Sequence, residues 1–218
     1  MRIRAVLIDF DDTIAMTQEV CFHFENQVLA DMGLPPMDRE VYRRTWGPPV
    51  EVAIALRVPG IDLEEYQRRF AARYEDDALG GPMSEVTDEN LGVLDALRGR
   101  GIALGLLTSR RHREMGNLLE CDHPLRARLD YFYGLDDVPE PKPSPRAFEP
   151  FLRSTGIAPA DCVYVGDAVN DAAAATGAGL HFIANLENGT LRRESFEGYP
   201  VLGFIERFEN LLDLIDAI

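Results

Sequence analysis

The sequence predicts an α/β protein whose core is a doubly wound parallel sheet, with an all-helical cap domain inserted near the N-terminus. Short apolar runs without polar alternation are typical of parallel strands that are buried on both faces. Such runs alternate with helical patterns over residues 84–190, which favours strand–helix–strand crossovers. Residues 15–83 contain helical patterns and no clear strand. We therefore expect residues 1–14 and 84–218 to form the core and residues 15–83 to form the cap.

The expected strands are short and end at polar residues. Four apolar runs predict them, at residues 5–8, 102–107, 162–165 and 180–184. The first three runs are followed directly by Asp9, by Thr108 and by Gly166-Asp167. Ligands of open parallel sheets bind beyond the carboxyl ends of the strands. We expect these residues to meet at one sheet edge, together with Lys142, which precedes a helix.

Capping and breaking residues predict the helices. In the core they favour helices over residues 87–99, 145–156 and 170–177, since Thr87 can act as an N-cap and Pro145 suits a first turn. In the cap, glycines and prolines separate four helical patterns, at roughly residues 17–32, 38–46, 49–57 and 62–78. Gly80-Gly81-Pro82 is expected to be a hinge through which the chain returns to the core.

The composition indicates a globular protein with a negative electrostatic field. The formal net charge is −15 over 218 residues. This charge argues against nucleic acid and anionic membrane as partners, because both require a positive patch. Cys21, Cys121 and Cys162 form no CxxC pair, and the sequence shows neither a secretory signal nor a stretch of membrane-spanning length. We therefore expect a cytoplasmic protein with reduced thiols. Its oligomeric state is left open.

Lys142 is the only lysine among 22 lysine and arginine side chains. An ammonium is a compact donor on a flexible stem, whereas a guanidinium is a rigid planar fork. The isolation of Lys142 favours a site that requires an ammonium. The alternative is a chance survivor in an arginine-rich composition.

Several carboxylates at one sheet edge would repel one another and would need a neutralising partner. Raised pKa values, a lysine or a hard divalent cation could supply it, and magnesium suits a few carboxylates together with waters and a substrate phosphate. A carboxylate held there can attack phosphorus. A second carboxyl two residues further on can protonate the leaving oxygen and then deprotonate water. The pattern thus indicates phosphoryl transfer, with Thr108 and Lys142 supporting the transferring group.

Four segments together resemble the motifs of the haloacid dehalogenase-like hydrolase superfamily. Asp9-Phe10-Asp11-Asp12-Thr13 is similar to its first motif, DxDxT, and Thr108-Ser109-Arg110 to its second. Lys142 resembles the third motif, and Gly166-Asp167 to Asp171 resembles the fourth, GDxxxD. The resemblance covers nearly the whole chain. The helical insert after the first motif resembles the helical-cap subgroup, which includes phosphoglycolate phosphatase-like enzymes, and implies a Rossmann-like core.

The resemblance implies roles for the acidic residues. Asp9 resembles the nucleophile and a metal ligand. Asp11 resembles the general acid and base, and its backbone carbonyl resembles a further metal ligand. Asp167 resembles the other metal-binding side chain, and Asp171 resembles the acid that stands behind the metal and the lysine. The implied cofactor is Mg²⁺.

The remaining candidate residues concern the phosphate and the rest of the substrate. Thr108, Ser109 and Lys142 are the expected phosphate-binding residues. Gly47 lies between two cap helices and resembles a position of the substrate-specificity loop, against the alternative of an ordinary interhelical turn. Arg110 is a weaker candidate for reaching substrate. Asp12 departs from the glycine that many members of the superfamily carry.

The expected function is hydrolysis of a phosphoric monoester through an aspartyl-phosphate intermediate. The implied substrate is a small phosphorylated metabolite, either phosphoglycolate-like or a sugar phosphate. A phosphosugar mutase of the same superfamily is the alternative among enzymes. A signalling domain that is phosphorylated on aspartate and a catalytically inactive binding protein are the alternatives from other classes.

Overall fold

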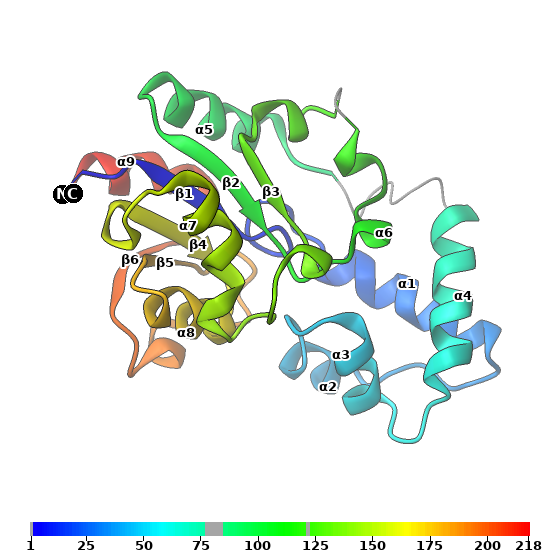
Figure 1. The fold of residues 1–218 in the computed structure, drawn as a ribbon. Helices are drawn as coiled ribbons and strands as arrows, with labels where there is room; N and C mark the ends of the chain where they lie inside the picture. Colours follow the sequence, from blue (N-terminus) through cyan, green and yellow to red (C-terminus); the bar gives the residue numbers. More distant parts are fainter. Residues whose placement is uncertain (1, 77–84, 121–122) are drawn as a thin grey trace.

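The computed structural model describes residues 2–76, 85–120 and 123–218. Its centre is a six-stranded sheet in the order β3-β2-β1-β4-β5-β6, in which every neighbouring pair is parallel (Figure 1). The strands are β1 (Ala5–Ile8), β2 (Ala103–Leu107), β3 (Tyr131–Tyr133), β4 (Cys162–Gly166), β5 (His181–Asn185) and β6 (Val201–Ile205). The prediction of a doubly wound parallel sheet is confirmed.

Helices cover both faces of the sheet, which explains why the central strands show no polar alternation. In β1, Val6 and Ile8 pack in a cluster with residues of α5 and α9, whereas Ala5 and Leu7 pack with residues of α7 and α8 on the other face. These helices are α5 (Asp88–Gly99), α7 (Glu149–Thr155), α8 (Val169–Gly177) and α9 (Leu211–Asp216). A further short helix, α6 (His112–Met115), follows the loop after β2.

The predicted starts and ends of the core helices are largely confirmed. The Thr87 hydroxyl accepts a hydrogen bond from the backbone N–H of Asn90, as an N-cap does, at 3.2 Å. Gly156 ends α7 with a left-handed φ of 64°. The helix predicted from Pro145 begins as a 3₁₀ turn, Pro145–Phe148, before α7 continues it.

The two edge strands, β3 and β6, were missing from the prediction. β3 has only three residues, all aromatic and half-buried, so its run is shorter than those that predicted the other strands. β6 is half-buried over most of its length and contains Gly203. A side chain at Gly203 would meet Leu214 of α9 at 2.5 Å. The residues of β6 are apolar on both sides of Gly203, so its sequence carried a strand signal that the prediction did not use.

Four helices come between β1 and α5: α1 (Gln18–Asp31), α2 (Arg39–Arg44), α3 (Val50–Arg57) and α4 (Leu63–Asp76). No strand occurs within the described residues 15–76. The four helices share an apolar cluster that includes Phe24, Leu29, Tyr42, Ile54 and Tyr66. They lie beyond the arrowheads of β2 and β3 (Figure 1). The predicted hinge at Gly80-Gly81 lies outside the described residues.

No helix in the described part of the chain is both long and apolar enough to span a bilayer.

Candidate active site

The loop after β1 places its acidic side chains at the centre of the sheet edge. The backbone N–H of Asp9 still donates to the carbonyl of Val165 in β4 at 2.9 Å, so Asp9 continues the strand by one residue. The chain then turns, with the N–H groups of Ile14 and Ala15 both donating to the carbonyl of Phe10. Asp9 is therefore positioned by the sheet itself, whereas the residues that follow belong to a tight loop.

Asp12 holds this loop against the first cap helix. Its φ is 54°, in the left-handed region that favours glycine. This backbone conformation agrees with the glycine that the resembled motif often carries at this position. The buried carboxylate accepts hydrogen bonds from the backbone N–H groups of Thr17 at 2.8 Å and Gln18 at 3.0 Å. Burial raises the pKa of Asp12 to about 6 although these bonds oppose the shift. Asp12 thus organises the loop at the start of α1.

Lys142 makes three polar contacts from a buried position. Its ammonium lies 2.9 Å from Asp9 Oδ1 and 2.7 Å from Asp171 Oδ1, and it donates to the Tyr164 hydroxyl at 2.9 Å. Tyr164 in turn donates to the carbonyl of Leu107 at 2.9 Å. Burial alone would lower the pKa of Lys142, but Asp171 and Asp9 raise it well above the ordinary value. All three N–H donors of a charged lysine are therefore in use.

Asp171 is fixed on both sides. One carboxylate oxygen contacts Lys142, and the other accepts the backbone N–H of Ala168 at 3.0 Å in the first turn of α8. A side chain at Gly166 would meet Asp171 Oδ2 at 2.5 Å. Glycine is thus required before Asp167 because Asp171 folds back over the end of β4.

Asp9, Asp167 and Asp171 are buried and offer one oxygen each within 4.8 Å of one another. Lys142 is the cation that contacts this group, so two negative charges would remain uncompensated if all three acids were ionised. Burial raises the pKa of Asp9 to about 7 despite Lys142, and burial together with Asp171 and Asp9 raises the pKa of Asp167 well above its ordinary value. A buried excess of carboxylate charge is the condition in which a divalent cation is stabilised.

The oxygen atoms that remain for a metal belong to Asp9 and Asp167. Asp9 uses Oδ1 for Lys142, and Asp167 uses Oδ2 to accept from the Asn188 amide at 2.7 Å. Among the described residues, no hydrogen bond reaches the other oxygen of either carboxylate, whereas both oxygens of Asp171 are engaged. An all-oxygen donor set of this kind fits a hard cation. The geometry agrees with a place for Asp171 behind the metal.

The carboxylate of Asp11 is held by an arginine from the loop after β2. Arg110 Nη2 lies 2.6 Å from Asp11 Oδ1, and Arg110 Nε donates to Asp11 Oδ2 at 3.0 Å. Thr17 donates its hydroxyl to Asp11 Oδ1 at 2.5 Å. The Thr108 hydroxyl accepts the backbone N–H of Arg110 at 3.2 Å. The sequence-predicted contact of Arg110 with substrate stays a prediction, but the structure gives Arg110 a carboxylate partner that was not foreseen.

One cavity joins these residues to the cap helices. It has a volume of about 90 Å³, and from the core its lining includes Asp9, Asp11, Ser109, Arg110 and Asp167. We call it the Asp9 cavity. Thr108, Lys142 and Asp171 are buried behind this wall and are not among its lining residues.

The cap supplies the opposite wall of the Asp9 cavity. Gly47 lies in this wall between Trp46 and Pro48, with a φ of 108° that favours glycine. A side chain at Gly47 would come 3.7 Å from Cβ of Ala168, so the loop approaches the core closely there. The rest of the wall is mostly apolar, with one buried ion pair between Glu25 and Arg57.

Sequence reasoning missed four polar residues of this site. Tyr164 lies inside an apolar strand. A tyrosine hydroxyl in such a strand needs a buried hydrogen-bond partner, and this was the signal by which the sequence could have indicated it. Asn188 follows β5 in a loop with no motif, and the pairing of Glu25 with Arg57 joins two helices 32 residues apart. No local pattern indicates such a pair.

The comparisons with known proteins agree with this geometry. A family model described as haloacid dehalogenase-like hydrolase matches residues 6–185. Phosphoglycolate phosphatase 1 of Pseudomonas aeruginosa is 28 % identical over 98 % of this chain and 80 % of its own length. Phosphoglycolate phosphatase of Xylella fastidiosa is 31 % identical over 81 % of this chain and 77 % of its own.

Solved structures share the fold. The crystal structure of CbbY from Rhodobacter sphaeroides in complex with phosphate superimposes with a TM-score of 0.77 at 26 % identity, covering 98 % of this chain and 99 % of that one.

Proposed function

This chain belongs to the haloacid dehalogenase-like hydrolase family, and from this premise we propose that it hydrolyses the phosphoric monoester of a small metabolite through an aspartyl-phosphate on Asp9. The proposal rests above all on the contact of Lys142 with Asp9 inside a cluster of three buried carboxylates. A phosphoryl group entering the Asp9 cavity would meet the carboxylates of Asp9 and Asp167, which have oxygen atoms left for a cation, and the ammonium of Lys142 lies directly behind Asp9. We propose phosphoglycolate-like compounds and sugar phosphates as the candidate substrates.

In the first step, an oxygen of Asp9 forms a bond to phosphorus while the bond from phosphorus to the ester oxygen breaks. Asp11 would act as the general acid in its protonated form, so its ion pair with Arg110 must open when substrate binds, and its proton then passes to the leaving oxygen. In the second step, Asp11 takes a proton from water, the water oxygen bonds to phosphorus, and the bond between phosphorus and Asp9 breaks. Asp11 lies at the cavity wall, two residues from the nucleophile, and Arg110 and Thr17 fix its position.

The cations of the site stabilise the transferring group. Lys142 lies against Asp9, and its three N–H donors are taken by protein acceptors, so it would exchange one of these contacts for a phosphoryl oxygen. We expect Lys142, Thr108 and Ser109 to donate to the phosphoryl oxygens in this way. We expect Asp9, Asp167 and the backbone carbonyl of Asp11 to hold Mg²⁺, which would offset the charge that develops on the phosphoryl oxygens. Asp171 keeps Lys142 in place.

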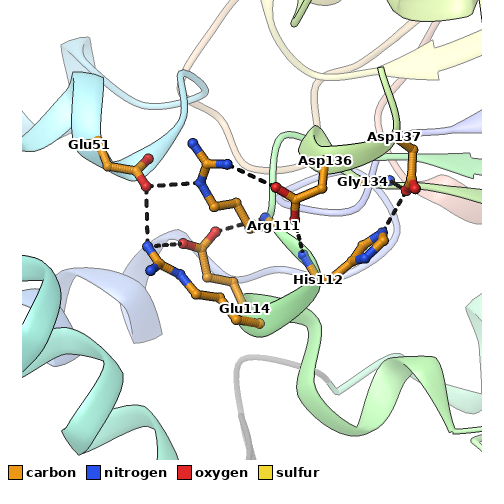
Figure 2. A network of polar contacts seen from close by, with 8 residues as sticks. Glu51, Arg111, His112, Glu114, Gly134, Asp136 and Asp137 are labelled. Carbon is orange, nitrogen blue, oxygen red and sulfur yellow. Dashed lines mark hydrogen bonds and ion pairs between the residues drawn. The ribbon is translucent and has the colours of Figure 1, made fainter. Parts of the chain in front are cut away.

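We further propose that residues 15–83 act as a cap over a core formed by residues 1–14 and 84–218, closing on the Asp9 cavity to exclude water during transfer. Ion pairs between α3 and the loop after β2 support this idea. Figure 2 shows Glu51 of α3 facing Arg111, which also reaches Asp136, and the distances are 3.0 and 2.9 Å. Glu51 also lies 3.2 Å from Arg113. We call Glu51, Arg111 and Arg113 the seam.

Phosphate release tests the proposed function. The purified protein would be incubated with p-nitrophenyl phosphate and a panel of small phosphate esters in Mg²⁺, and inorganic phosphate would be measured. Asp9→Asn, which keeps the shape of the side chain but removes the nucleophile, should lose turnover by on the order of 10³-fold or more. Unchanged activity of Asp9→Asn would contradict the mechanism. Product analysis separates a hydrolase, which releases phosphate, from a mutase, which returns an isomeric phosphate ester.

A further inference from the structure

The cap wall of the Asp9 cavity carries a cation whose hydrogen-bonding capacity is spent within the cap. Arg57 Nη1 donates to both carboxylate oxygens of Glu25, at 2.8 and 2.6 Å. The side chains of Arg57 and Glu25 are only 2 % and 5 % exposed. Arg57 Nε donates to the Thr45 hydroxyl and Nη2 to the Thr45 carbonyl, both at 3.0 Å. Most of the five N–H donors of this guanidinium are therefore taken.

The guanidinium of Arg57 is also held in place by an aromatic ring. Its central carbon lies 4.1 Å from the ring centroid of Tyr42 and 5.9 Å from that of Trp46. Such stacking favours one orientation of the planar group. Turning Arg57 toward a substrate anion would break the Glu25 pair and leave a buried carboxylate unpaired, which is strongly unfavourable.

The other cation in the cavity wall is committed as well. Arg110 contacts both oxygens of Asp11 and donates from Nη1 to the Glu114 carbonyl at 3.4 Å. Five carboxyl groups and two guanidinium groups line the cavity, so carboxyl groups outnumber the guanidinium groups that face them. Lys142 and a bound metal would be occupied by the phosphoryl group. Among the described residues that line this cavity, none would be left as a counter-ion for a second anionic group on the substrate.

The remaining lining of the cap wall is apolar. Phe24, Phe70 and Val50 supply carbon surface, and Trp46 and Tyr74 add further ring faces. A carboxylate moved from water onto such a surface loses its hydration without compensation. An uncharged carbon skeleton gains from the same contact, and its hydroxyl group can donate to a lone pair of Glu25. The cavity volume of about 90 Å³ limits the size of this group.

We propose that the alcohol released by this enzyme is small and uncharged, such as a short polyol or sugar, and carries no carboxylate. This inference rests on the proposed phosphatase function and narrows it. It separates this chain from the relatives named phosphoglycolate phosphatase, because glycolate carries a carboxylate. The supporting observation is that Glu25 and Arg57, which neutralise each other, lie in the otherwise apolar cap wall of the cavity that also contains Asp9.

Two matched substrate pairs test the proposal. Glycerol 3-phosphate and 3-phosphoglycerate differ at one carbon, which is a CH₂OH group in the first and a carboxylate in the second. Ethyl phosphate and phosphoglycolate differ in the same sense. We expect kcat/KM to favour the uncharged member of each pair by at least about 10-fold, the order expected for a buried group without a partner. Equal values, or a preference for the carboxylates, would overturn the proposal.

Glu25→Gln sharpens the test because it removes the carboxylate that neutralises Arg57 while keeping the shape of the side chain. The variant should shift the ratio of kcat/KM values toward the carboxylate substrates by roughly 10-fold. Rescue of phosphoglycolate turnover would support the inference, and an unchanged ratio in a folded variant would contradict it. The wild-type comparison decides the question even if Glu25→Gln does not fold.

A second groove provides the control. It has a volume of about 590 Å³, shares Trp46, Pro48 and Asp167 with the Asp9 cavity, and is also lined by Arg43 and Arg44. If a substrate carboxylate reached these arginines instead, the wild type would accept carboxylates and Arg44→Gln would lose that activity, which would overturn the proposal. A protein that hydrolyses none of the esters, p-nitrophenyl phosphate included, would overturn the proposed function and this inference with it. A clear preference for phosphoglycolate would overturn the inference alone.

Discussion

The two walls of the Asp9 cavity balance their charges in different ways. On the core side, Asp9 and Asp167 line the cavity, and Asp171 and the ammonium of Lys142 lie buried behind them, so three carboxylates share one ammonium. The cap wall sets one carboxylate, Glu25, against one guanidinium, Arg57. The charges of both walls are almost fully removed from water, so solvent and salt screen their interactions only weakly.

The difference teaches that burial of charge serves two purposes here. Among the described residues, the core wall has a surplus of negative charge and carboxylate oxygens without a hydrogen-bond partner, and under the proposed function a cation and a phosphoryl group would complete it. The cap wall is complete without a ligand, so its ion pair shapes the cavity and stabilises the cap. Changes in the core wall should therefore affect chemistry most, and changes in the cap wall should affect stability and selectivity.

The largest expected effect is removal of the metal. Exhaustive chelation should reduce phosphate release to the background rate, and Mg²⁺ should restore it, because the acids of the core wall then lack their counter-charge. The measurement is phosphate release before and after chelation and re-addition. Activity that persisted without divalent cation would refute the expected role of Mg²⁺.

Proton uptake gives an independent check on the same wall. Asp9 has a pKa raised from 3.8 to about 7, so the folded state binds its proton more tightly than the unfolded chain does. Stability of the metal-free protein should therefore fall as pH rises through this window. Mg²⁺ requires ionised carboxylates, so its binding near pH 7 should release protons. Calorimetric titration in two buffers with different ionisation enthalpies would detect that release.

The next effect is the replacement of Lys142 by arginine. The ammonium reaches three acceptors at 2.7–2.9 Å in different directions, which a planar fork of larger size cannot reproduce. Lys142→Arg should fold and yet lose on the order of 10²-fold or more in kcat. Steady-state kinetics on p-nitrophenyl phosphate would measure the loss, with circular dichroism as the folding control. Lys142→Ala should do no better, and near wild-type kcat in Lys142→Arg would show that charge alone suffices.

The third effect is on stability and concerns the cap wall. Arg57→Ala leaves Glu25 buried without its partner, so we expect a loss of roughly 3–5 kcal/mol in the free energy of unfolding. The matched control is the exposed pair of Arg207 with Glu209, which lies 3.0 Å apart with side chains 63 % and 36 % exposed. Arg207→Ala should cost only about 0–1 kcal/mol. Urea denaturation of both variants would measure the two losses, and equal losses would contradict the contrast between buried and exposed pairs.

The smallest effect is expected at the seam. Glu51 is 17 % exposed, and its partners Arg111 and Arg113 are 38 % and 47 % exposed, so salt screens these pairs. Glu51→Gln should weaken cap closure slightly and raise KM by a few-fold at low salt, with the difference shrinking in high salt. Glu65→Gln is the control, because the ion pairs of Glu65 within the described part of the chain are with arginines of its own helix, α4. A KM change in Glu51→Gln that does not depend on salt would argue against the seam.

The sequence by itself determined the α/β class, the central strands and the residues at their carboxyl ends. These depend on local patterns: an uninterrupted apolar run such as residues 5–8 has one favourable environment, between two layers of helices. The parallel order of the strands then brings Asp9, Thr108 and Asp167 to one edge without further information. The catalytic roles of these residues stay predictions until the kinetic experiments are done.

The tertiary structure alone decided which side chains pair. Arg110 meets Asp11 across 99 residues of sequence, Lys142 meets Tyr164, and Arg57 meets Glu25. Each pair depends on how whole helices and strands pack. Moving a charged residue by one position along a helix would point its side chain to another face of that helix. Packing likewise decided that the partly exposed strands β3 and β6 pair with β2 and β5 at the two edges of the sheet, although the apolar residues of β6 are visible in the sequence. Partner choice is a property of the packed molecule, because burial decides which charges must meet.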